Sequence, residues 1–280
     1  MKLPIESRLK KNCRAVCFYL LPVLLVLMTS ACDDQLVVSE SAMDSARSQK
    51  ELLIYCGITM IQPMSEIATI IEKQENCKVT ITKGGSGNLL KSILHNQTGD
   101  LYLPGSDRYF SIIANEHAGL VSETVLVGAN RAAMMVQKGN PKAIPANLTS
   151  LADSQYAVVI GNPDSGSIGK ETKKILEKKG IFADVVKNAM YMTTDSKELL
   201  KAIKNKEADI VINWFAASTW DDNGQFLDVI DIDPEYAQTK KLMLGLLKFS
   251  QNPDLAGKLM NLAGSKQGSE IFRKYGLRFD

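Results

Sequence analysis

Short apolar runs alternate with longer amphipathic stretches along the chain from Glu51 onward. This alternation is typical of parallel β-strands covered by helices. The apolar runs predict five strands, at Leu52–Cys56, Lys78–Thr82, Asp100–Pro104, Tyr156–Ile160 and Asp209–Asn213. Apolar residues recur at helical spacing in three stretches: after Asn88, at Lys170–Lys179 and around Leu200. Gly180 is expected to cap the second of these helices at its C-terminus. We therefore expect an α/β fold.

A long extended run from Val125 to Pro141 is predicted to cross between two lobes, with a return near Trp214–Thr219. These crossings assign residues 50–126 plus 220–280 to lobe 1 and residues 127–219 to lobe 2. Helices from Tyr236 onward are expected to complete lobe 1. Each lobe is expected to be a mostly parallel sheet flanked by helices, and two crossings leave a cleft and a hinge between the lobes.

The N-terminal residues predict an export signal, because five basic residues lie ahead of an uncharged run at residues 15–31. A single membrane-spanning anchor is the alternative, but Pro22 interrupts the run, whose length is near the lower limit for a span. Small residues lead directly into Cys32, which resembles the bacterial lipobox, although Thr29 stands where Leu is usual. This resemblance implies that residues 1–31 are removed and that Cys32 carries a lipid.

Asp33 and Asp34 resemble the signal that retains Gram-negative lipoproteins in the inner membrane. Residues 32–49 are largely polar and Ser-rich, which is typical of a flexible tether. We expect a lipid-anchored protein on the periplasmic side of the inner membrane, or on the cell surface if the organism is Gram-positive.

Removal of residues 1–31 takes away five of the 33 basic and one of the 31 acidic residues, leaving 28 against 30 and a net charge of −2. This balance does not indicate a nucleic-acid partner. Two cysteines remain in the folded part, Cys56 at the end of one predicted strand and Cys77 at the start of its neighbour. Several residues would separate them along the strands, too far for a disulfide, so we expect two buried free thiols.

Short polar turns end four of the predicted strands, and they read G-I-T, K-G-G-S-G-N, G-N-P-D-S-G-S-I-G and I-N-W. The carboxyl ends of parallel strands share one edge of a sheet, where ligands bind. Hydroxyl donors in these turns are Thr59, Ser86, Ser165 and Ser167, and the glycines beside them allow backbone N–H groups to face a cleft. Each such residue alone is an ordinary helix cap, but together they predict an oxyanion site at helix N-termini.

An enzyme is the alternative class of protein, and few features of the sequence support it. The serine-bearing turns lack a nucleophile-elbow motif, and the two histidines, His95 and His117, are badly placed in the chain for a triad. Metal-ligand spacing and the Walker pattern are both missing. The aspartates around Asp221 and Asp231 lack the glycine and distant glutamate of a calcium loop. We therefore expect neither catalysis, nor a metal, nor a cofactor.

At this point the sequence resembles the periplasmic molybdate-binding proteins and their tungstate-binding relatives, within the type 2 periplasmic binding fold. The resemblance runs from about Leu52 to the C-terminus. It depends on L-L-I-Y-C-G-I-T, V-T-I-T-K-G-G-S-G-N-L-L-K-S-I, G-D-L-Y-L-P-G-S-D, T-T-D-S-K-E-L-L-K-A-I-K-N-K-E-A-D-I-V-I-N-W and A-G-S-K-Q-G-S-E-I-F-R-K-Y-G-L. It implies the solute-binding subunit of an ABC importer, with a small oxyanion as ligand and the transporter permease as partner.

The resemblance also implies particular site residues. The family's hydroxyl contacts fall on Thr59, where serine is usual, and on Ser86. Amide donors from the second lobe fall near Gly166 and Ser167 and again near Ser196. The family's cleft tyrosine falls on Trp214, with Asn213 beside it, and an indole donates differently from a phenol.

The sequence leaves several alternatives open. Because Trp214 stands where the family has tyrosine, two identities remain for the ligand. It is molybdate or tungstate, or it is another solute such as phosphate, sulfate or a small organic anion. Lys83, Arg108 and Lys170 are candidates to line the cleft, and a lining cation would favour phosphate. The protein could also serve a sensor kinase instead of a transporter.

Overall fold

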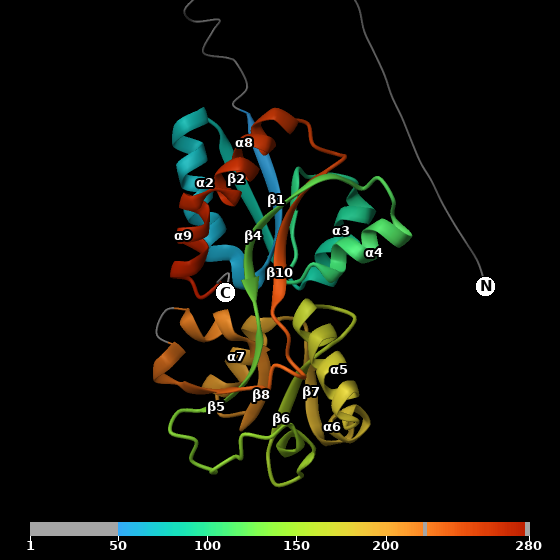
Figure 1. Cartoon of the computed structure of the whole chain (residues 1–280), viewed down its shortest axis with the longest axis vertical. Coiled ribbons are helices and arrows are strands. Elements are labelled where there is room, and N and C mark those ends of the chain that lie inside the picture. The colour runs from blue at the N-terminus through green and yellow to red at the C-terminus, as the bar shows by residue number, and fades with distance from the viewer. Residues whose placement is uncertain (1–49, 221–222, 278–280) are drawn as a thin grey trace, which may run out of the picture. The chain divides into compact units, whose positions relative to one another are not determined.

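The computed structural model describes residues 50–220 and 223–277. The predicted export signal, the lipid site Cys32 and the tether lie outside the described residues. The described chain forms two five-stranded sheets, each flanked by helices (Figure 1). Among the described residues no helix is long and apolar enough to cross a membrane.

The first sheet has the strand order β2-β1-β3-β10-β4. Strands β1 (Glu51–Gly57), β2 (Lys78–Gly84) and β3 (Leu101–Leu103) are parallel, whereas β10 (Lys240–Leu247) is antiparallel to both β3 and β4 (Val121–Asn130). One face packs on α2 (Ile61–Glu75), α8 (Pro253–Gly264) and α9 (Lys266–Lys274), and the other packs on α3 (Ser86–Asn96) and α4 (Arg108–Glu116) (Figure 1). This sheet and its helices are called lobe 1 below.

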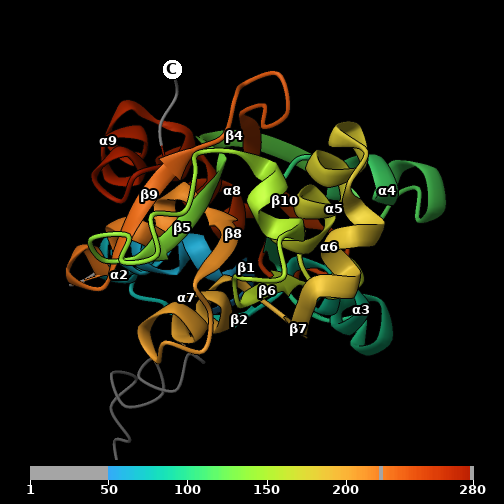
Figure 2. The ribbon, with the colours of Figure 1, turned by 90° about the horizontal axis from the view of Figure 1, so that it is seen from below.

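The second sheet has the order β7-β6-β8-β5-β9. Strands β6 (Val158–Gly161), β7 (Ala189–Thr193) and β8 (Ile210–Trp214) are parallel, and β5 (Ala132–Gln137) is antiparallel to β8 and β9 (Leu227–Asp231). Figure 2 shows α5 (Ser167–Lys179) and α6 (Phe182–Asn188) on one side of this sheet and α7 (Ser196–Lys204) on the other. This unit, lobe 2, has its own apolar core. Short 3-10 turns η1 (Ile58–Met60), η2 (Leu148–Ala152), η3 (Phe215–Thr219) and η4 (Asn223–Gln225) complete the described chain.

The predicted α/β fold with two sheets is confirmed, and all five predicted strands are present as β1, β2, β3, β6 and β8. Two of the four strand pairings in each sheet are antiparallel, so the sheets are mixed rather than mostly parallel. The predicted helices after Asn88, at Lys170–Lys179 and around Leu200 are α3, α5 and α7. Gly180 ends α5 in the left-handed conformation that a glycine cap adopts.

The strand pairings place the crossings later than the expected boundaries at 126 and 219. Asn130 still pairs in the first sheet and Ala132 pairs in the second, so the chain crosses at Arg131. Because β9 pairs with β5, the return lies between Asp231 and Lys240 rather than at Trp214–Thr219. Part of the segment from Tyr236 onward, which was expected to be helical, is β10, an interior strand of the first sheet.

Cys56 and Cys77 are buried free thiols, as predicted. Strands β1 and β2 pair in parallel with Glu51 opposite Lys78 and Cys56 opposite Lys83. The two cysteines therefore lie at opposite ends of the paired strands. Burial raises the pKa of both thiols, which keeps them protonated and unreactive near neutral pH.

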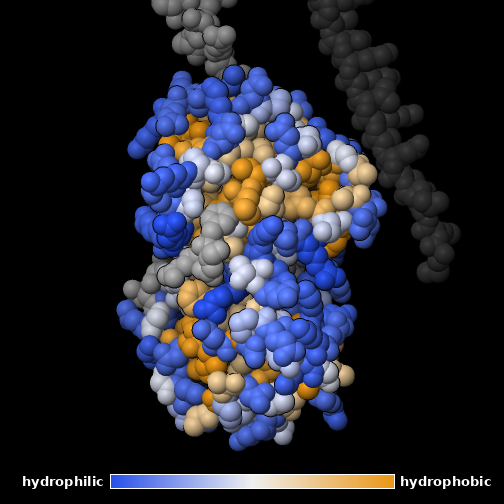
Figure 3. All heavy atoms as spheres, viewed as in Figure 1, coloured by the Kyte–Doolittle hydropathy of each residue, from blue (hydrophilic) through white to orange (hydrophobic). Residues whose placement is uncertain are grey.

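Apolar side chains are mostly inside the molecule. Figure 3 shows a mainly hydrophilic face with separate apolar areas on both lobes. Exposed large apolar residues among those described are Leu126, Phe226 and a run on the edge strand β7, Met190 to Met192.

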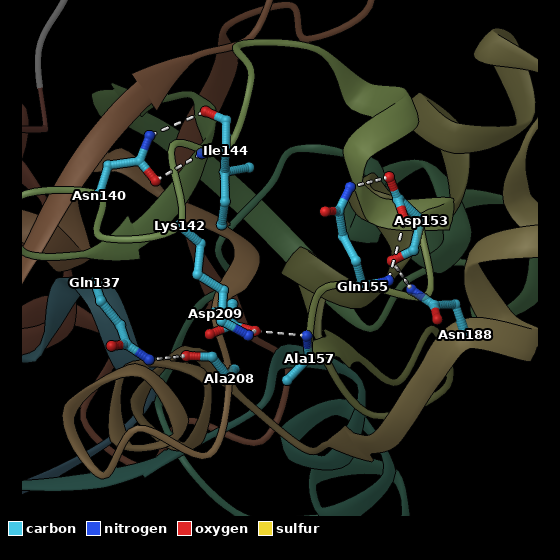
Figure 4. A network of polar contacts seen from close by, with 10 residues as sticks. All are labelled: Gln137, Asn140, Lys142, Ile144, Asp153, Gln155, Ala157, Asn188, Ala208 and Asp209. Atoms are coloured by element: carbon cyan, nitrogen blue, oxygen red, sulfur yellow. Dashed lines mark hydrogen bonds and ion pairs between the residues drawn. The ribbon is translucent and has the colours of Figure 1, made fainter.

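Lobe 2 contains a buried polar contact at Asp209, just before β8 (Figure 4). One oxygen of its carboxylate accepts from the Ala157 N–H at 2.7 Å and from Lys142 Nζ at 2.6 Å. Next to it, Gln137 Nε2 donates to the Ala208 carbonyl at 3.0 Å, which joins β5 to the same segment. These contacts fix the start of β8, the strand that ends at the cleft.

Asp209→Ala should lower the free energy of unfolding by about 1–3 kcal/mol, because the Ala157 N–H would lose its partner in a mostly buried position. Urea denaturation followed by circular dichroism measures the change. Glu51→Ala, which removes the exposed Lys78–Glu51 ion pair, is the control and should change stability little. An Asp209→Ala variant as stable as the parent would show that this contact does not stabilise lobe 2.

Candidate ligand-binding site

A small cavity lies between the two lobes at the carboxyl ends of their parallel strands. About 230 Å³ of space lies between its lining atoms, part of it open to solvent, but the enclosed part holds only about one water-sized group. A ligand larger than a water molecule therefore has to move the cavity walls apart, and the displacement is smaller for a ligand of few heavy atoms. Its lining residues are Gly57, Ile58, Thr59, Gly84, Gly85, Ser86 and Gly105 from lobe 1 and Gly166, Ser167, Ile168, Asp195, Ser196 and Trp214 from lobe 2.

The N-termini of three α-helices meet at this cavity. Helix α3 begins at Ser86 after the N-cap Gly85, and α5 begins at Ser167 after the N-cap Gly166, and neither cap makes a side-chain hydrogen bond. The first N–H groups of a helix lack partners within the helix, and they carry the positive end of its dipole. Two glycine-capped helices, one from each lobe, therefore present bare backbone donors to the same small space.

Helix α7 differs from α3 and α5 because a carboxylate side chain of the protein already binds its N-terminal N–H groups. Asp195 caps it, and one carboxylate oxygen accepts from the N–H groups of Lys197 at 2.8 Å and Glu198 at 3.2 Å. Burial raises the pKa of the Asp195 carboxyl, and the two backbone N–H groups partly oppose that shift. Asp195 is the one ionisable residue that lines the cavity in the described part of the chain.

The basic residues considered from the sequence do not line the cavity. Lys83 and Arg108 are exposed and Lys170 is half-buried, and all three lie outside the lining set. Among the described residues, no group of three side chains has the composition of a metal site. The donors that face the cavity are therefore neutral hydroxyls and backbone N–H groups.

Ser86 and Ser167 have matching hydrogen bonds. Ser86 Oγ accepts from the Gly105 N–H at 3.0 Å, and Ser167 Oγ accepts from Trp214 Nε1 at 3.1 Å. Neither serine hydroxyl donates to another described residue. Because both oxygens already serve as acceptors and both residues line the cavity, their protons are left to serve a ligand.

Thr59 is the third buried hydroxyl of the cavity. It donates to the thioether of Met60 at 2.9 Å and is 3.5 Å from Asn130 Nδ2, a donor on β4. A thioether is a weak acceptor, so an anion in the cavity would compete well for the Thr59 proton.

The structure brings together Thr59, Ser86, Gly166, Ser167, Ser196 and Trp214 of the expected site residues. Ser165 and Asn213 do not line the cavity. The Ser165 hydroxyl donates to the carbonyls of Asn162 and Thr194, whereas Asn213 Nδ2 donates to the Ser196 carbonyl at 2.9 Å and its Oδ1 accepts from Trp214 N. Both side chains support the walls of the cavity instead.

Sequence reasoning missed Gly105 and Asp195. Gly105 lies in the turn between β3 and α4 and has no side chain of its own, so its residue type does not mark it as part of a site. Asp195 had a readable signal, since T-D-S-K-E is a capping sequence in which Glu198 also accepts from the Thr194 N–H at 2.8 Å.

The lobes also touch directly beside the cavity. The Asn88 N–H, in the first turn of α3, donates to the Ser165 carbonyl of lobe 2 at 3.1 Å. A Cβ at Gly85 would lie 2.6 Å from the carbonyl oxygens of both Ser165 and Thr194. Glycine at this helix cap is therefore what allows the two backbones to approach.

Comparison with known proteins agrees with this arrangement. The chain matches the family described as bacterial extracellular solute-binding protein over residues 52–278. It belongs to that family. Membership of this family confirms that the chain is a binding protein rather than an enzyme. The family is extracellular.

A binding protein of Haemophilus influenzae is 25% identical over 228 residues, which are 81% of this chain and 90% of that protein. The periplasmic molybdate-binding protein of Azotobacter vinelandii has a similar structure, with a TM-score of 0.68, 13% identity, and 82% of this chain and 99% of that chain covered. PEB3 of Campylobacter jejuni, solved with L-phospholactate bound, gives a TM-score of 0.65 and 18% identity over 82% of this chain and all of that chain. The structural likeness of this solute-binding protein to the molybdate-binding structure confirms the type 2 periplasmic binding fold.

Asp195→Asn should strengthen anion binding, because asparagine remains a good helix cap while the negative charge leaves the cavity wall. The expected gain is about 1 kcal/mol, the value for two unit charges about 4 Å apart in a water-like dielectric. Isothermal titration calorimetry of both proteins with one anion measures it. The gain should shrink as the pH falls through the raised pKa of Asp195, since the parent carboxyl then becomes neutral as well. Equal affinities at neutral pH would show that Asp195 does not face the ligand.

Proposed function

We propose that this solute-binding protein captures a small tetrahedral oxyanion, with molybdate or tungstate favoured, and delivers it to an ABC importer. The observation that carries the proposal is the pair of cavity serines, one on each lobe. Each accepts a hydrogen bond from a buried N–H and so keeps its own proton for the ligand. The glycine-capped starts of α3 and α5 add backbone donors around the same point.

Neutral donors are sufficient for this task. An oxyanion leaving water must regain its hydrogen bonds, and preorganised N–H and O–H groups at helix N-termini supply several at once. The Asp195 charge is taken up by the first turn of α7, so α3 and α5 remain for the ligand. Because these two helices belong to different lobes, an anion that contacts both stabilises the arrangement in which the lobes meet.

A small organic anion is the second candidate. The PEB3 structure with L-phospholactate shows that this fold accommodates an organic phosphate in that protein. The narrow cavity favours the inorganic anion here, because a longer ligand would require the lobes to move further apart.

A thermal-shift screen tests the proposal, with molybdate, tungstate, sulfate, phosphate and L-phospholactate each added to the protein. A ligand at about 100 times its dissociation constant stabilises a fold by about 2.7 kcal/mol. For a domain of this size that corresponds to roughly 5–10 °C. Molybdate or tungstate should give the largest shift. A shift with L-phospholactate alone would support the second candidate, and no shift with any of them would overturn the proposal.

The proposal includes a lipid on Cys32 and a permease as partner. Cys32→Ser should release the exported protein from the membrane fraction, which immunoblotting of fractionated cells measures. A neighbouring permease gene would support transport, and a neighbouring sensor kinase gene would support signalling instead.

A further inference from the structure

A buried ion pair joins the two lobes one helical turn behind the cavity. Glu171 of α5 in lobe 2 faces Lys240 of β10 in lobe 1, and Lys240 Nζ lies 3.2 Å from Glu171 Oε1. Their side chains are 6% and 12% exposed. Among the described residues this is the one ion pair in which both side chains are mostly buried.

Both sides of the pair continue to the cavity. Glu171 follows Ser167 by four residues, so the two lie on the same face of α5. On the lobe 1 side, the carbonyl of Lys241, next to the paired lysine, accepts from the Asp107 N–H at 3.0 Å. Asp107 lies in the turn that carries Gly105, and a Cβ on Gly105 would overlap Ser167 Oγ. The pair therefore lies directly behind the point where Ser167 meets lobe 1.

The pair also lies beside the crossing between the lobes. Lys240 is the first residue of β10, and it is paired with Asn130, the last residue of β4. Its backbone therefore belongs to lobe 1, whereas Glu171 is carried by a helix of lobe 2. Separation of the lobes moves the carboxylate relative to the ammonium group.

Glu171 depends on this lysine for its counter-charge. Its Oε1 has no hydrogen-bond partner among the described residues, and Lys240 Nζ is the cation beside it. Taking a carboxylate out of water is unfavourable unless an opposite charge compensates for the lost hydration. The positive charge of Lys240 is also the main cause that lowers the pKa of Lys174, an exposed residue of α5. Lys240 thus acts electrostatically on lobe 2.

We infer that Glu171 and Lys240 are a positioning pair that couples anion affinity to the meeting of the lobes. The lobes bury the Glu171 carboxylate when they meet, and Lys240 supplies the charge that makes this burial favourable. Water reaches the carboxylate when the lobes separate. Neither residue lines the cavity, so the pair acts on the ligand through the lobes. This inference rests on the proposed function, because anion affinity is its main readout.

Lys240→Met tests the inference, because it keeps a long apolar side chain and removes the charge. Calorimetric titration should show tungstate affinity falling roughly 10- to 100-fold, less than the full cost of a lone buried charge because Lys174 remains near. Lys240→Arg keeps the charge and should bind as the parent does. Adding Glu171→Gln to Lys240→Met should recover most of the affinity, since no buried charge is then left unpaired.

Amide hydrogen exchange at Asn88 gives a readout without ligand. This N–H donates across the lobes to the Ser165 carbonyl, so its exchange reports their separation. In the ligand-free protein, Lys240→Met should speed exchange at Asn88 about 10-fold or more, as measured by NMR. Lys258→Met is the matched control, because it removes an ion pair with Glu75 inside lobe 1 and should change neither affinity nor exchange.

Parent-like tungstate binding by Lys240→Met, or a double variant that binds no better than Lys240→Met alone, would overturn the inference. A lowered melting temperature with unchanged exchange at Asn88 would also overturn it, since the pair would then be an ordinary contact of the fold. Should Lys240→Met fail to fold, adding it to Glu171→Gln must leave affinity unchanged, and a loss there would show that Lys240 does not act through Glu171. Failure of the proposed function looks different. The parent would then bind no tungstate, while exchange at Asn88 would still respond to Lys240→Met.

Discussion

Gly85→Ala should weaken ligand binding strongly while leaving both lobes folded. The added Cβ would lie 2.6 Å from two carbonyl oxygens of lobe 2, those of Ser165 and Thr194, far inside van der Waals contact. Both are backbone atoms, so no side-chain rotation relieves the overlap. Gly85 itself has φ −65° and ψ 136°, which alanine adopts freely, so lobe 1 alone tolerates the change.

The overlap acts only on the arrangement in which the lobes meet around the ligand. Overpacking of this kind costs about 1–3 kcal/mol or more, which corresponds to a loss of affinity of roughly 5- to 200-fold. A thermal-shift titration with tungstate measures it, and the melting temperature without ligand shows whether the fold is intact. Gly257→Ala in α8 is the matched control, because a Cβ there meets no atom within 4 Å. Parent-like binding by Gly85→Ala would mean that the ligand does not require this close approach of the lobes.

Ser86→Ala is expected to have the second large effect. Ser86 lines the cavity at the start of α3, and its oxygen is held by the Gly105 N–H at 3.0 Å. A hydrogen bond to a charged group contributes about 1.5–3 kcal/mol, so loss of the hydroxyl should weaken oxyanion binding by roughly 10- to 150-fold. Isothermal titration calorimetry with molybdate or tungstate measures the change.

Ser150→Ala provides the control for that experiment. Ser150 is also a buried serine, but it lies in η2 of lobe 2, away from the cavity lining, and it donates to the Pro145 carbonyl at 3.2 Å. Its loss should leave anion affinity unchanged. If Ser86→Ala binds as the parent does, the hydroxyl does not contact the ligand and the serine-pair account is wrong.

The sequence predicts five of the six parallel strands, because those strands are short apolar runs bounded by polar turns, and it misses the exposed edge strand β7. It does not predict β10. The segment K-K-L-M-L-G-L-L is apolar enough for either a strand or a buried helix, and only its pairing with β3 and β4 decides between them. The chain returns to lobe 1 later than predicted for the same reason. Strand β9 belongs to lobe 2 because it pairs with β5, which is distant in the sequence. Such pairings are not local properties of the chain.

The residues of the candidate site also divide into those that the local sequence predicts and those that it does not. Thr59, Ser86 and Ser167 are readable because each stands in a polar turn between a strand and a helix. Ser165 stands in a comparable turn and Asn213 near the end of β8. Their side chains donate to the carbonyls of Thr194 and Ser196, contacts that no local pattern reveals. Gly105 and the donor role of Trp214 also depend on contacts between distant segments. Local chemistry therefore identifies the turns, and tertiary contacts decide which hydroxyls reach the ligand.

The position of a bound anion tests the central claim most directly. Crystals grown with tungstate and measured at a tungsten absorption edge give an anomalous signal that marks the metal atom. The account predicts one peak in the cavity between the lobes, with tungstate oxygens about 2.5–3.0 Å from both Ser86 Oγ and Ser167 Oγ. A peak elsewhere on the molecule, or one whose oxygens contact a single lobe, would contradict it.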